Sequence, residues 1–529
     1  AFARLTGWPA VITSLLLGAF SSVAFAPFHF SAVLVISFTC LIWMLDGARG
    51  HRKWGKAVFL RTWAFGAGFF LISMHWTAAP FLVEPEKHAI FLWMPLILLP
   101  GGMALIWGAF GAMAGAFWSS SPSRIFIFAL FFALAEYVRG HLFGGFPWNL
   151  PGTTWIPGGA LSQTASIGGV YWLTLVTVFI MSAPAALVDT RESRQLAVRI
   201  APVFAAVILL ALGWTWGAQR IAQPSAQSDQ FVVLMDSGVP QNEKWEIGPD
   251  PILIEYLRML STQEGEAGDI ILWPEGALPT TLLQDANALD AVGAYLGPRE
   301  LIAGTTRYEI TGKNMRDYYN SLTVIDENAI RSGPVALYDK HRLVPFGELP
   351  ATRIIPFGEA LSGILPGAIQ RMASDGFRPG PGPAVIYADD IPPFVAMICY
   401  EGLYPSIPRN ANLGARADWL VLISNDAWFG GGMGPAQHYA QNRYRSIETG
   451  LPMARVASRG ASAIVDGLGR EVLRAAPVAD APSGWSMSFG RGRLPLPESV
   501  TLFQTRIGMM LFWLSLFLFA GLAFLTWRR

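Results

Sequence analysis

Repeated long apolar stretches constrain the fold of this chain more than any other feature. A helix needs about 20 mainly apolar residues to cross the hydrocarbon core of a bilayer. Seven such stretches precede residue 218 and one closes the chain, at 9–26, 31–45, 62–79, 90–118, 125–138, 167–187, 200–216 and 507–527. We therefore predict an integral membrane α-helical bundle of about eight transmembrane helices.

Composition agrees with a membrane protein and excludes one class of partner. Hydrophobic residues make up 52% of the 529 residues and charged residues only 14%, far from the average of soluble proteins. Lys and Arg total 38 against 37 Asp and Glu, a formal net charge of +1. Such a balance gives no basic field for phosphate backbones, so we expect no nucleic-acid partner.

The first apolar stretch has two readings. An apolar run followed by the small-residue sequence AFA at 24–26 is also the pattern of a signal peptide. Further apolar spans follow at once, however. We therefore predict that residues 9–26 form a first transmembrane helix.

Basic residues predict the orientation of the spans. The loops 46–61 and 188–199 carry most of the basic residues between spans, whereas the loop 141–166 has no Lys or Arg. Short loops rich in Lys and Arg stay on the cytoplasmic side. Alternation then predicts that both termini lie in the cytoplasm and residues 217–506 on the outer side. The basic residues in question are Arg49, Arg52, Lys53, Lys56, Arg61, Arg191, Arg194 and Arg199.

The texture of the chain changes between residues 230 and 488. Short β-branched runs alternate with helical patterns and with Gly, Pro and Asn turns, which is typical of a layered α/β domain. Strands are expected near 231–235, 269–275, 301–306, 319–326, 394–401, 419–426, 453–458 and 462–466, and helices at 251–262, 285–295 and 437–448. We predict a transmembrane region at 1–217, a catalytic domain at 218–505 and a C-terminal transmembrane helix at 506–529.

Two loops are unusually apolar for a soluble surface. Residues 141–159 and 343–369 mix aromatic and aliphatic residues with Gly and Pro, and they carry few charges. Such backbone fits a site at the membrane surface, where Trp and Tyr also gather. Ordinary loops buried against the domain would have the same composition, and both readings stay open.

Three predicted strands deliver a reactive side chain at their carboxyl ends, where α/β sheets usually build their sites. Glu275 follows DIILWP, Lys340 lies in YDKHRLVPFGE, and Cys399 lies in AMICYE. Taken singly, these residues are ordinarily a solvated strand end, a surface lysine and a small buried hydrophobe. Together they supply the base, the cation and the nucleophile that thiol catalysis needs.

In this order and context, WPE, YDKHRLVPFGE and CYE resemble the nitrilase, or carbon-nitrogen hydrolase, superfamily. The resemblance covers about 231–488 and implies an α-β-β-α sandwich with a Glu-Lys-Cys triad. With seven spans before this domain and one after it, the whole chain resembles the bacterial apolipoprotein N-acyltransferase family. The segments QNEKWE, SNDAWFG and AQHYAQNRYRSIETGLPMARVASRG are also similar to that family.

The resemblance implies roles for eight residues. Glu275 is the general base, Cys399 the nucleophile, and Lys340, with the backbone N–H of Tyr400, stabilises the oxyanion. Glu348 and Glu401 are supporting acidic residues, and Tyr400 shapes the acyl site. Trp245 and Trp428 form pocket walls or mobile loops, although plain core or interface aromatics would read the same.

The resemblance also implies a reaction. Cys399 takes an acyl chain from a membrane phospholipid as a thioester, and the N-terminal amine of the diacylglyceryl-modified Cys of an apolipoprotein then accepts it. This ping-pong transfer completes lipoprotein maturation, on the periplasmic side of the bacterial inner membrane. We expect a monomer and no cofactor or metal, since neither metal-ligand spacing nor a phosphate-binding glycine loop is present.

Several alternatives remain at this stage. A membrane-tethered amidase that uses water as acceptor would share the triad, and a transporter with an accessory domain would share the spans. His438 is a weaker candidate base for Cys399, Cys40 is expected to pack inside the second span, and Glu136 and Arg139 to pair or lie at the interface. No role is assigned to residues 371–383.

Overall fold

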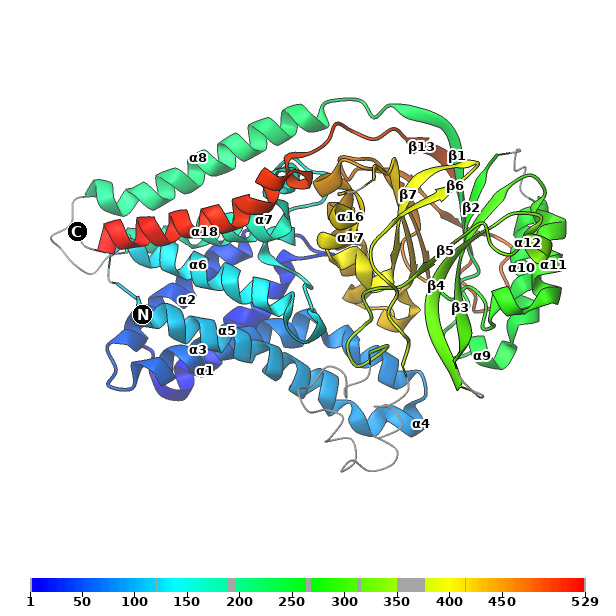
Figure 1. Cartoon of the computed structure of the whole chain (residues 1–529). Helices are drawn as coiled ribbons and strands as arrows, with labels where there is room; N and C mark the ends of the chain where they lie inside the picture. The colour runs from blue at the N-terminus through cyan, green and yellow to red at the C-terminus, as the bar shows by residue number, and fades with distance from the viewer. Residues whose placement is uncertain are drawn as a thin grey trace.

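The computed structural model describes residues 2–119, 121–188, 196–262, 268–311, 315–349, 376–413 and 415–527. A helical bundle lies on one side of the molecule and two β-sheets on the other, with α16 and α17 between them (Figure 1). Both chain termini lie at the end of the bundle remote from the sheets (Figure 1). The architecture is therefore a membrane bundle with an α/β domain at one end.

The bundle is built from apolar helices joined by short loops and 3-10 turns. Its α-helices are α1 (Gly7–Ser21), α2 (Val33–Arg49), α3 (Trp54–Ser73), α4 (Pro85–His88), α5 (Leu99–Ala116), α6 (Ser123–Arg139), α7 (Ala165–Ser182), α8 (Leu196–Ile221) and α18 (Arg506–Trp527).

Six of the eight predicted spans are helices long and apolar enough to cross a membrane, within the described part of the chain. The other two, α2 and α6, are helices of 17 residues each. Both are largely buried inside the bundle, so tertiary contacts rather than lipid cover their faces. Prediction and structure thus agree on the helical bundle. They differ in the number of helices that are long and apolar enough to cross a membrane, which is six in the described residues against eight predicted.

A buried ion pair closes α6 at the end that faces the α/β domain. Arg139 Nη2 lies 2.5 Å from Glu136 Oε2, and both side chains are almost fully buried. Trp107 Nε1 donates to Glu136 Oε1 at 2.7 Å, and Arg139 Nη1 donates to the Phe146 carbonyl at 2.5 Å. The predicted mutual pairing of Glu136 and Arg139 is therefore confirmed.

The α/β domain contains two mixed sheets. The first has the order β12-β13-β1-β2-β3-β4-β5 and the second β11-β10-β9-β8-β7-β6. Parallel pairs, β1–β2–β3 and β7–β8–β9, occupy the centres, and antiparallel strands flank them. The strands are β1 (Gln227–Asp236), β2 (Ile270–Leu272), β3 (Glu300–Thr311), β4 (Met315–Ile325), β5 (Ala336–Asp339), β6 (Val385–Ala388), β7 (Ile391–Ile398), β8 (Trp419–Asn425), β9 (Met453–Ser458), β10 (Ala463–Val465), β11 (Glu471–Arg474), β12 (Ala476–Pro477) and β13 (Ser488–Pro495).

Alternating side chains bind these sheets into four layers. On β7, Phe394, Ala396 and Ile398 face the first sheet, whereas Val395 and Met397 face the opposite way. Helices cover the outer face of each sheet. These helices are α9 (Lys244–Ile247), α10 (Pro249–Thr262), α11 (Ala286–Leu296) and α12 (Ala329–Ser332) for the first sheet, and α16 (Ser406–Ala411) and α17 (Met433–Thr449) for the second. The result is the α-β-β-α sandwich that the resemblance implied.

The second sheet and the bundle share one hydrophobic core. Val395 and Met397 of β7 belong to the same buried cluster as Phe70 and Trp107 of the bundle. The buried carboxylate of Glu448 on α17 also accepts the Val170 backbone N–H of α7 at 2.8 Å. The α/β domain is therefore packed onto the bundle and not merely tethered to it.

Most predicted elements are present, and the differences are local. The strand expected at 269–275 ends at Leu272, because the chain turns at Pro274 to present Glu275. The short β5, β6, β11, β12 and β13 were not predicted, since two to eight residues without a clear alternation carry little signal. The apolar loop 141–159 is mostly buried against α17, and most of the loop 343–369 lies outside the described residues.

We predict that Arg139→Leu strongly destabilises the protein, because it leaves the Glu136 carboxylate buried without its cation. Breaking a buried pair by removing one partner typically costs about 3–5 kcal/mol. Thermal unfolding in detergent would show a large fall in Tm for Arg139→Leu and a smaller one for the double variant Glu136→Leu/Arg139→Leu. Lys87→Ala, which opens an exposed pair with Glu84, is the matched control. Equal losses in the single and double variants would contradict this account.

Candidate active site

Cys399 lies at the turn that ends β7. It has a backbone φ of 51°, in the left-handed region that residues with a side chain seldom adopt. The 3-10 helix η11 (Cys399–Leu403) begins at this residue, so the chain turns sharply as the strand ends. The thiol side chain is buried within the site, at the edge of the sandwich core. A strained turn of this kind is a recurring feature of functional sites.

Glu275 and Lys340 meet at the corresponding edge of the first sheet. Lys340 directly follows β5, and Glu275 follows the Trp-Pro turn after β2. Lys340 Nζ lies 3.2 Å from Glu275 Oε1 and 2.9 Å from the Glu348 carboxylate. One buried ammonium is thus shared by two carboxylates, and together these three residues carry one net negative charge.

Two asparagines hold this charge cluster in place. Asn320 Nδ2, on β4, donates to Glu275 Oε1 at 2.7 Å and to Glu348 Oε1 at 2.8 Å. The Asn425 backbone N–H, at the end of β8, donates to Glu275 Oε2 at 2.9 Å. Both oxygens of Glu275 therefore have fixed partners. Neither asparagine was predicted, although Asn425 lies in the segment SNDAWFG.

Glu401 joins the lysine segment to the cysteine turn. Its buried carboxylate accepts from Tyr338 Oη, from the His341 and Arg342 backbone N–H groups, and from the Ile398 backbone N–H, all at 2.9–3.0 Å. The first three donors flank Lys340, and the fourth directly precedes Cys399. The structure therefore gives this predicted supporting residue a definite place between the two sheets.

Tyr400 connects the cysteine turn to the membrane bundle. Its hydroxyl donates to the Gly145 carbonyl at 2.6 Å, in the loop that follows α6. Tyr404 Oη donates to the Gly144 and Gly145 carbonyls, both at 3.0 Å, and its ring packs on that of Tyr400. The loop 141–159 thus supports the turn that contains Cys399.

The charges around the site set the protonation of its members. Burial raises the pKa of the Cys399 thiol, Glu275 raises it further, and Lys340 opposes both without cancelling them. Burial lowers the pKa of Lys340, but the Glu275 and Glu348 carboxylates outweigh this effect and bring it above its ordinary value. At neutral pH the site therefore holds a neutral thiol beside a charged ammonium.

His438 is directed at the backbone of Cys399. Its Nε2 donates to the Cys399 carbonyl at 3.2 Å, and its Nδ1 lies 3.0 Å from Asp426 Oδ1. Arg455 Nη2 donates to Asp426 Oδ2 at 2.7 Å. Although burial alone would raise it, Arg455 and His438 hold the pKa of Asp426 well below its ordinary value. This buried group braces the turn, which supports the preference for Glu275 over His438 as base.

Part of the stretch 371–383, to which sequence reasoning gave no role, supports Lys340. The Gly380 backbone N–H donates to the Lys340 carbonyl at 2.9 Å, and its own carbonyl lies 3.1 Å from His341 Nδ1. A Cβ at Gly380 would collide with the Asp339 carbonyl, so only glycine fits there. The Gly- and Pro-rich sequence RPGPGP at 378–383 was the available signal.

The two predicted tryptophans lie at the surface. Trp245, on α9, is 71% exposed and Trp428, on the 3-10 helix η12 (Asp426–Phe429), is 40% exposed. Their neighbours reach the site: Lys244 Nζ donates to the Gly276 carbonyl, next to Glu275. Burial lowers the pKa of Lys244 to about 8. Both indoles are therefore accessible to a ligand. Lys244 also anchors the segment of Trp245 next to Glu275.

The described residues contain no group of three or more His, Cys, Asp or Glu side chains arranged to hold a metal ion. The site instead provides the thiol of Cys399, the carboxylate of Glu275, which can accept a proton, and the ammonium of Lys340, which two carboxylates hold in place. Such a set can perform covalent acyl transfer, with charge stabilised where it develops.

Comparison with known proteins gives two family matches. The family model for the apolipoprotein N-acyltransferase N-terminal domain matches residues 17–183, and that for carbon-nitrogen hydrolases matches residues 259–479. The second match includes Glu275, Lys340 and Cys399.

Curated relatives match nearly the whole chain. The apolipoprotein N-acyltransferase of Caulobacter vibrioides is 35% identical over 477 residues, covering 88% of this chain and 86% of the relative. That of Rhodopseudomonas palustris is 32% identical over 481 residues, covering 88% and 87%. Among solved structures, a nitrilase-superfamily amidase from Nesterenkonia matches with 16% identity and a TM-score of 0.33, over 55% of this chain and 98% of its own.

We predict that Glu401→Gln slows turnover by about 10- to 100-fold and costs about 1–3 kcal/mol of stability, because an amide NH₂ would face backbone N–H donors. Steady-state kinetics and thermal unfolding measure the two effects. Glu255→Gln, which removes a carboxylate from a pair with Arg258 on α10, is the control and should stay within about 0.5 kcal/mol. Unchanged turnover in Glu401→Gln would refute its role between the sheets.

A second prediction concerns thiol reactivity. Because the pKa of Cys399 is raised, alkylation by iodoacetamide should be slow at neutral pH and should keep rising above about pH 9. Mass spectrometry of the Cys40→Ala variant follows Cys399 alone, since these are the two cysteines of the chain. A rate that levels off below about pH 8 would mean that the thiolate is stabilised instead.

Proposed function

The chain belongs to the apolipoprotein N-acyltransferase family and is a membrane acyltransferase, and from this premise we propose how its residues act and on what. It transfers a fatty acyl chain from a membrane phospholipid to the N-terminal amine of the diacylglyceryl-modified Cys of an apolipoprotein. The observation that carries this proposal is the position of Cys399. Its turn is hydrogen-bonded through Tyr400 to a loop of the bundle and is coupled electrostatically to Glu275 and Lys340.

The first half-reaction forms a thioester. Glu275 takes the thiol proton as the sulfur of Cys399 attacks the ester carbonyl of the phospholipid. Lys340 and the Tyr400 backbone N–H stabilise the oxyanion. The ester C–O bond then breaks, Glu275 returns the proton to the leaving glycerol oxygen, and a lysophospholipid departs. A raised thiol pKa fits this scheme, because the proton is still present for Glu275 to take.

The second half-reaction uses the same groups in reverse. The acceptor amine attacks the thioester carbonyl, Glu275 takes the amine proton, and the C–S bond breaks. The proton returns to sulfur, and the product is an amide. Because the acyl chain is held as a thioester on Cys399 after the lysophospholipid has left, the order of events is ping-pong.

The supporting residues maintain the charge of the site. Glu348 offsets part of the Lys340 charge while Glu275 is protonated, so that the ammonium stays charged throughout the cycle. Glu401 fixes the position of the Lys340 segment relative to the turn that contains Cys399. Tyr400 shapes the wall against which the acyl chain lies, and Trp245 and Trp428 border the entrance for the substrates.

The basic residues of the loops between the spans support a position of this chemistry at the outer surface of a bilayer. We assign residues 1–217 and 506–529 to the inner membrane of a bacterium and 218–505 to the periplasmic side. Both termini are then cytoplasmic, as are the basic residues between α2 and α3. The bilayer supplies both lipid-anchored substrates, so a monomer is sufficient for the reaction.

Intact-mass measurement tests the proposal. Detergent-purified protein incubated with one defined phospholipid and no acceptor should gain the mass of one acyl chain. Hydroxylamine should remove the added mass, because it cleaves thioesters. Addition of a synthetic diacylated lipopeptide with a free N-terminal amine should also remove it and yield the triacylated amide.

The Cys399→Ala variant is the matched control and should gain no mass. Lys340→Met should form the thioester about 100- to 1,000-fold more slowly, as expected for the loss of an oxyanion donor. Absence of a mass gain in folded wild-type protein would refute the phospholipid as acyl donor. Loss of the acyl group to water at the same rate with and without lipopeptide would indicate an amidase-type hydrolase.

A further inference from the structure

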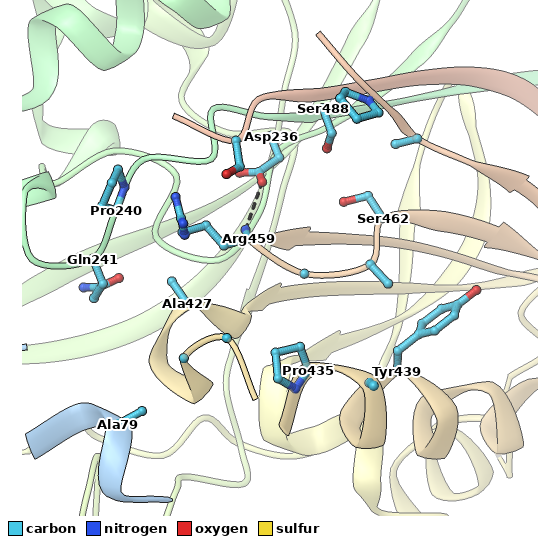
Figure 2. Close-up of a pocket in the computed structure, with 18 of the residues that line it drawn as sticks. Ala79, Asp236, Pro240, Gln241, Ala427, Pro435, Tyr439, Arg459, Ser462 and Ser488 are labelled. Atoms are coloured by element: carbon cyan, nitrogen blue, oxygen red, sulfur yellow. Dashed lines mark hydrogen bonds between the residues drawn. The ribbon is translucent and has the colours of Figure 1, made fainter. Parts of the chain in front are cut away.

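A large cavity lies between the membrane-side loops and the α/β domain, next to the catalytic edge of the sheets (Figure 2). Its volume is about 1220 Å³, slightly above the usual range for small-molecule sites, which is about 300–1,000 Å³. Pro27 and His29 line it from the loop after α1, and Leu82 and Val83 from the segment after α3. One wall of the cavity is therefore formed by segments at the ends of the bundle helices.

The cavity reaches the catalytic site through one side chain. Gln241, labelled in Figure 2, lines the cavity and accepts a hydrogen bond from Asn425 Nδ2 at 2.9 Å. The backbone N–H of Asn425 in turn holds Glu275 Oε2. Glu275, Lys340 and Cys399 do not themselves line the cavity. A ligand in the cavity would thus be separated from Glu275 by two hydrogen-bonded residues, Gln241 and Asn425.

Three arginines lie over the ring of Tyr439 in the cavity wall, and two of them, Arg443 and Arg474, line the cavity. The guanidinium carbons of Arg443 and Arg474 are 5.6 and 4.9 Å from the ring centre of Tyr439. Arg443 makes one hydrogen bond to the described protein, from Nε to the Gly469 carbonyl at 2.8 Å. Arg474 makes one, to Glu471 at 3.2 Å, in a solvent-exposed pair of the kind that contributes little. Most of their N–H donors therefore remain available.

A third arginine, Arg459, also lines the cavity. Arg459, which follows β9, has a backbone φ of 51° and donates Nη1 to the Gly238 carbonyl at 2.9 Å. Among the described residues of the lining, the one that is acidic is Asp236 (Figure 2). Its carboxylate is occupied by the backbone N–H groups of Gly238 and Arg459, at 2.9 and 3.0 Å. Cationic groups thus outnumber acidic ones in this lining.

We propose that this cavity binds the phosphodiester headgroup of the glycerophospholipid acyl donor, with Arg443 and Arg474 as its anion-binding residues. The guanidinium fork suits phosphate oxygens. A wall at bilayer level suits a ligand whose acyl chains stay in the membrane. This inference rests on the proposed function, because it assigns part of the donor to a site near Glu275.

The test separates the two half-reactions. Thioester formation at Cys399 is followed by intact mass against the concentration of a phosphatidyl lipid, and separately with a phosphate-free ester of the same acyl chain, p-nitrophenyl palmitate. Arg443→Gln/Arg474→Gln should raise KM for the phospholipid by about 10-fold or more per arginine, with little change for the p-nitrophenyl ester. Arg443→Lys/Arg474→Lys should recover part of the loss, since the charge remains. The control is Arg316→Gln, which removes an exposed arginine lying on Tyr308 of β3, away from the cavity.

Each other outcome would overturn the proposal in a distinct way. Equal slowing with both esters would show a structural role for the arginines. Slowing confined to transfer from the thioester to a lipopeptide would assign the cavity to the acceptor. Inorganic phosphate could also inhibit the wild type but not Arg443→Gln/Arg474→Gln, while KM for the phospholipid is the same in both. That result would identify a site for free phosphate. Absence of a thioester in the wild type, with either ester, would instead refute the proposed function.

Discussion

A buried ammonium with two carboxylate partners is the constraint on which the rest of the site depends. Transfer of a lysine from water into a protein interior is costly unless opposite charges accompany it. Glu275 comes from the end of β2 and Glu348 from the loop beyond β5, so the first sheet must be complete before Lys340 is compensated. Glu401 then couples this cation to the turn of the second sheet. Compensation of the Lys340 charge, closure of the sandwich and positioning of the Cys399 thiol therefore depend on one another.

The bundle contributes to the site as well as to anchoring. The Glu136–Arg139 pair fixes the Phe146 carbonyl, and the neighbouring Gly145 carbonyl receives the hydroxyls of Tyr400 and Tyr404. A chain of buried polar contacts therefore runs from the end of α6 to the residue that follows the nucleophile. A soluble member of the same superfamily would need other groups in this place.

Sequence reasoning proposed Glu275, Lys340 and Cys399 as the residues that carry chemistry, because each has a local signature. Glu275 and Cys399 follow apolar runs that end in a turn. The transmembrane spans are recognised by the length of their apolar stretches. It did not identify Asn320 or Asn425, since an asparagine near a strand end reads the same whether it faces solvent or a carboxylate. Their partners are 45 and 150 positions away, and only the packing of two sheets reveals them. The loop 141–159 was recognised as unusual, but its role as a support for the cysteine turn depends on the distant hydroxyl of Tyr400.

The hydrophobic core shared by the bundle and the second sheet has a geometric consequence. Because Val395 and Met397 of β7 share a buried core with the bundle, movement of the strand relative to the helices would disrupt that packing. The sulfur of Cys399 is thereby held at one fixed height above the membrane interior. For the phospholipid donor that we propose, the depth of the ester carbonyl along the bilayer normal then becomes a requirement for reaction, in addition to the shape of the lipid.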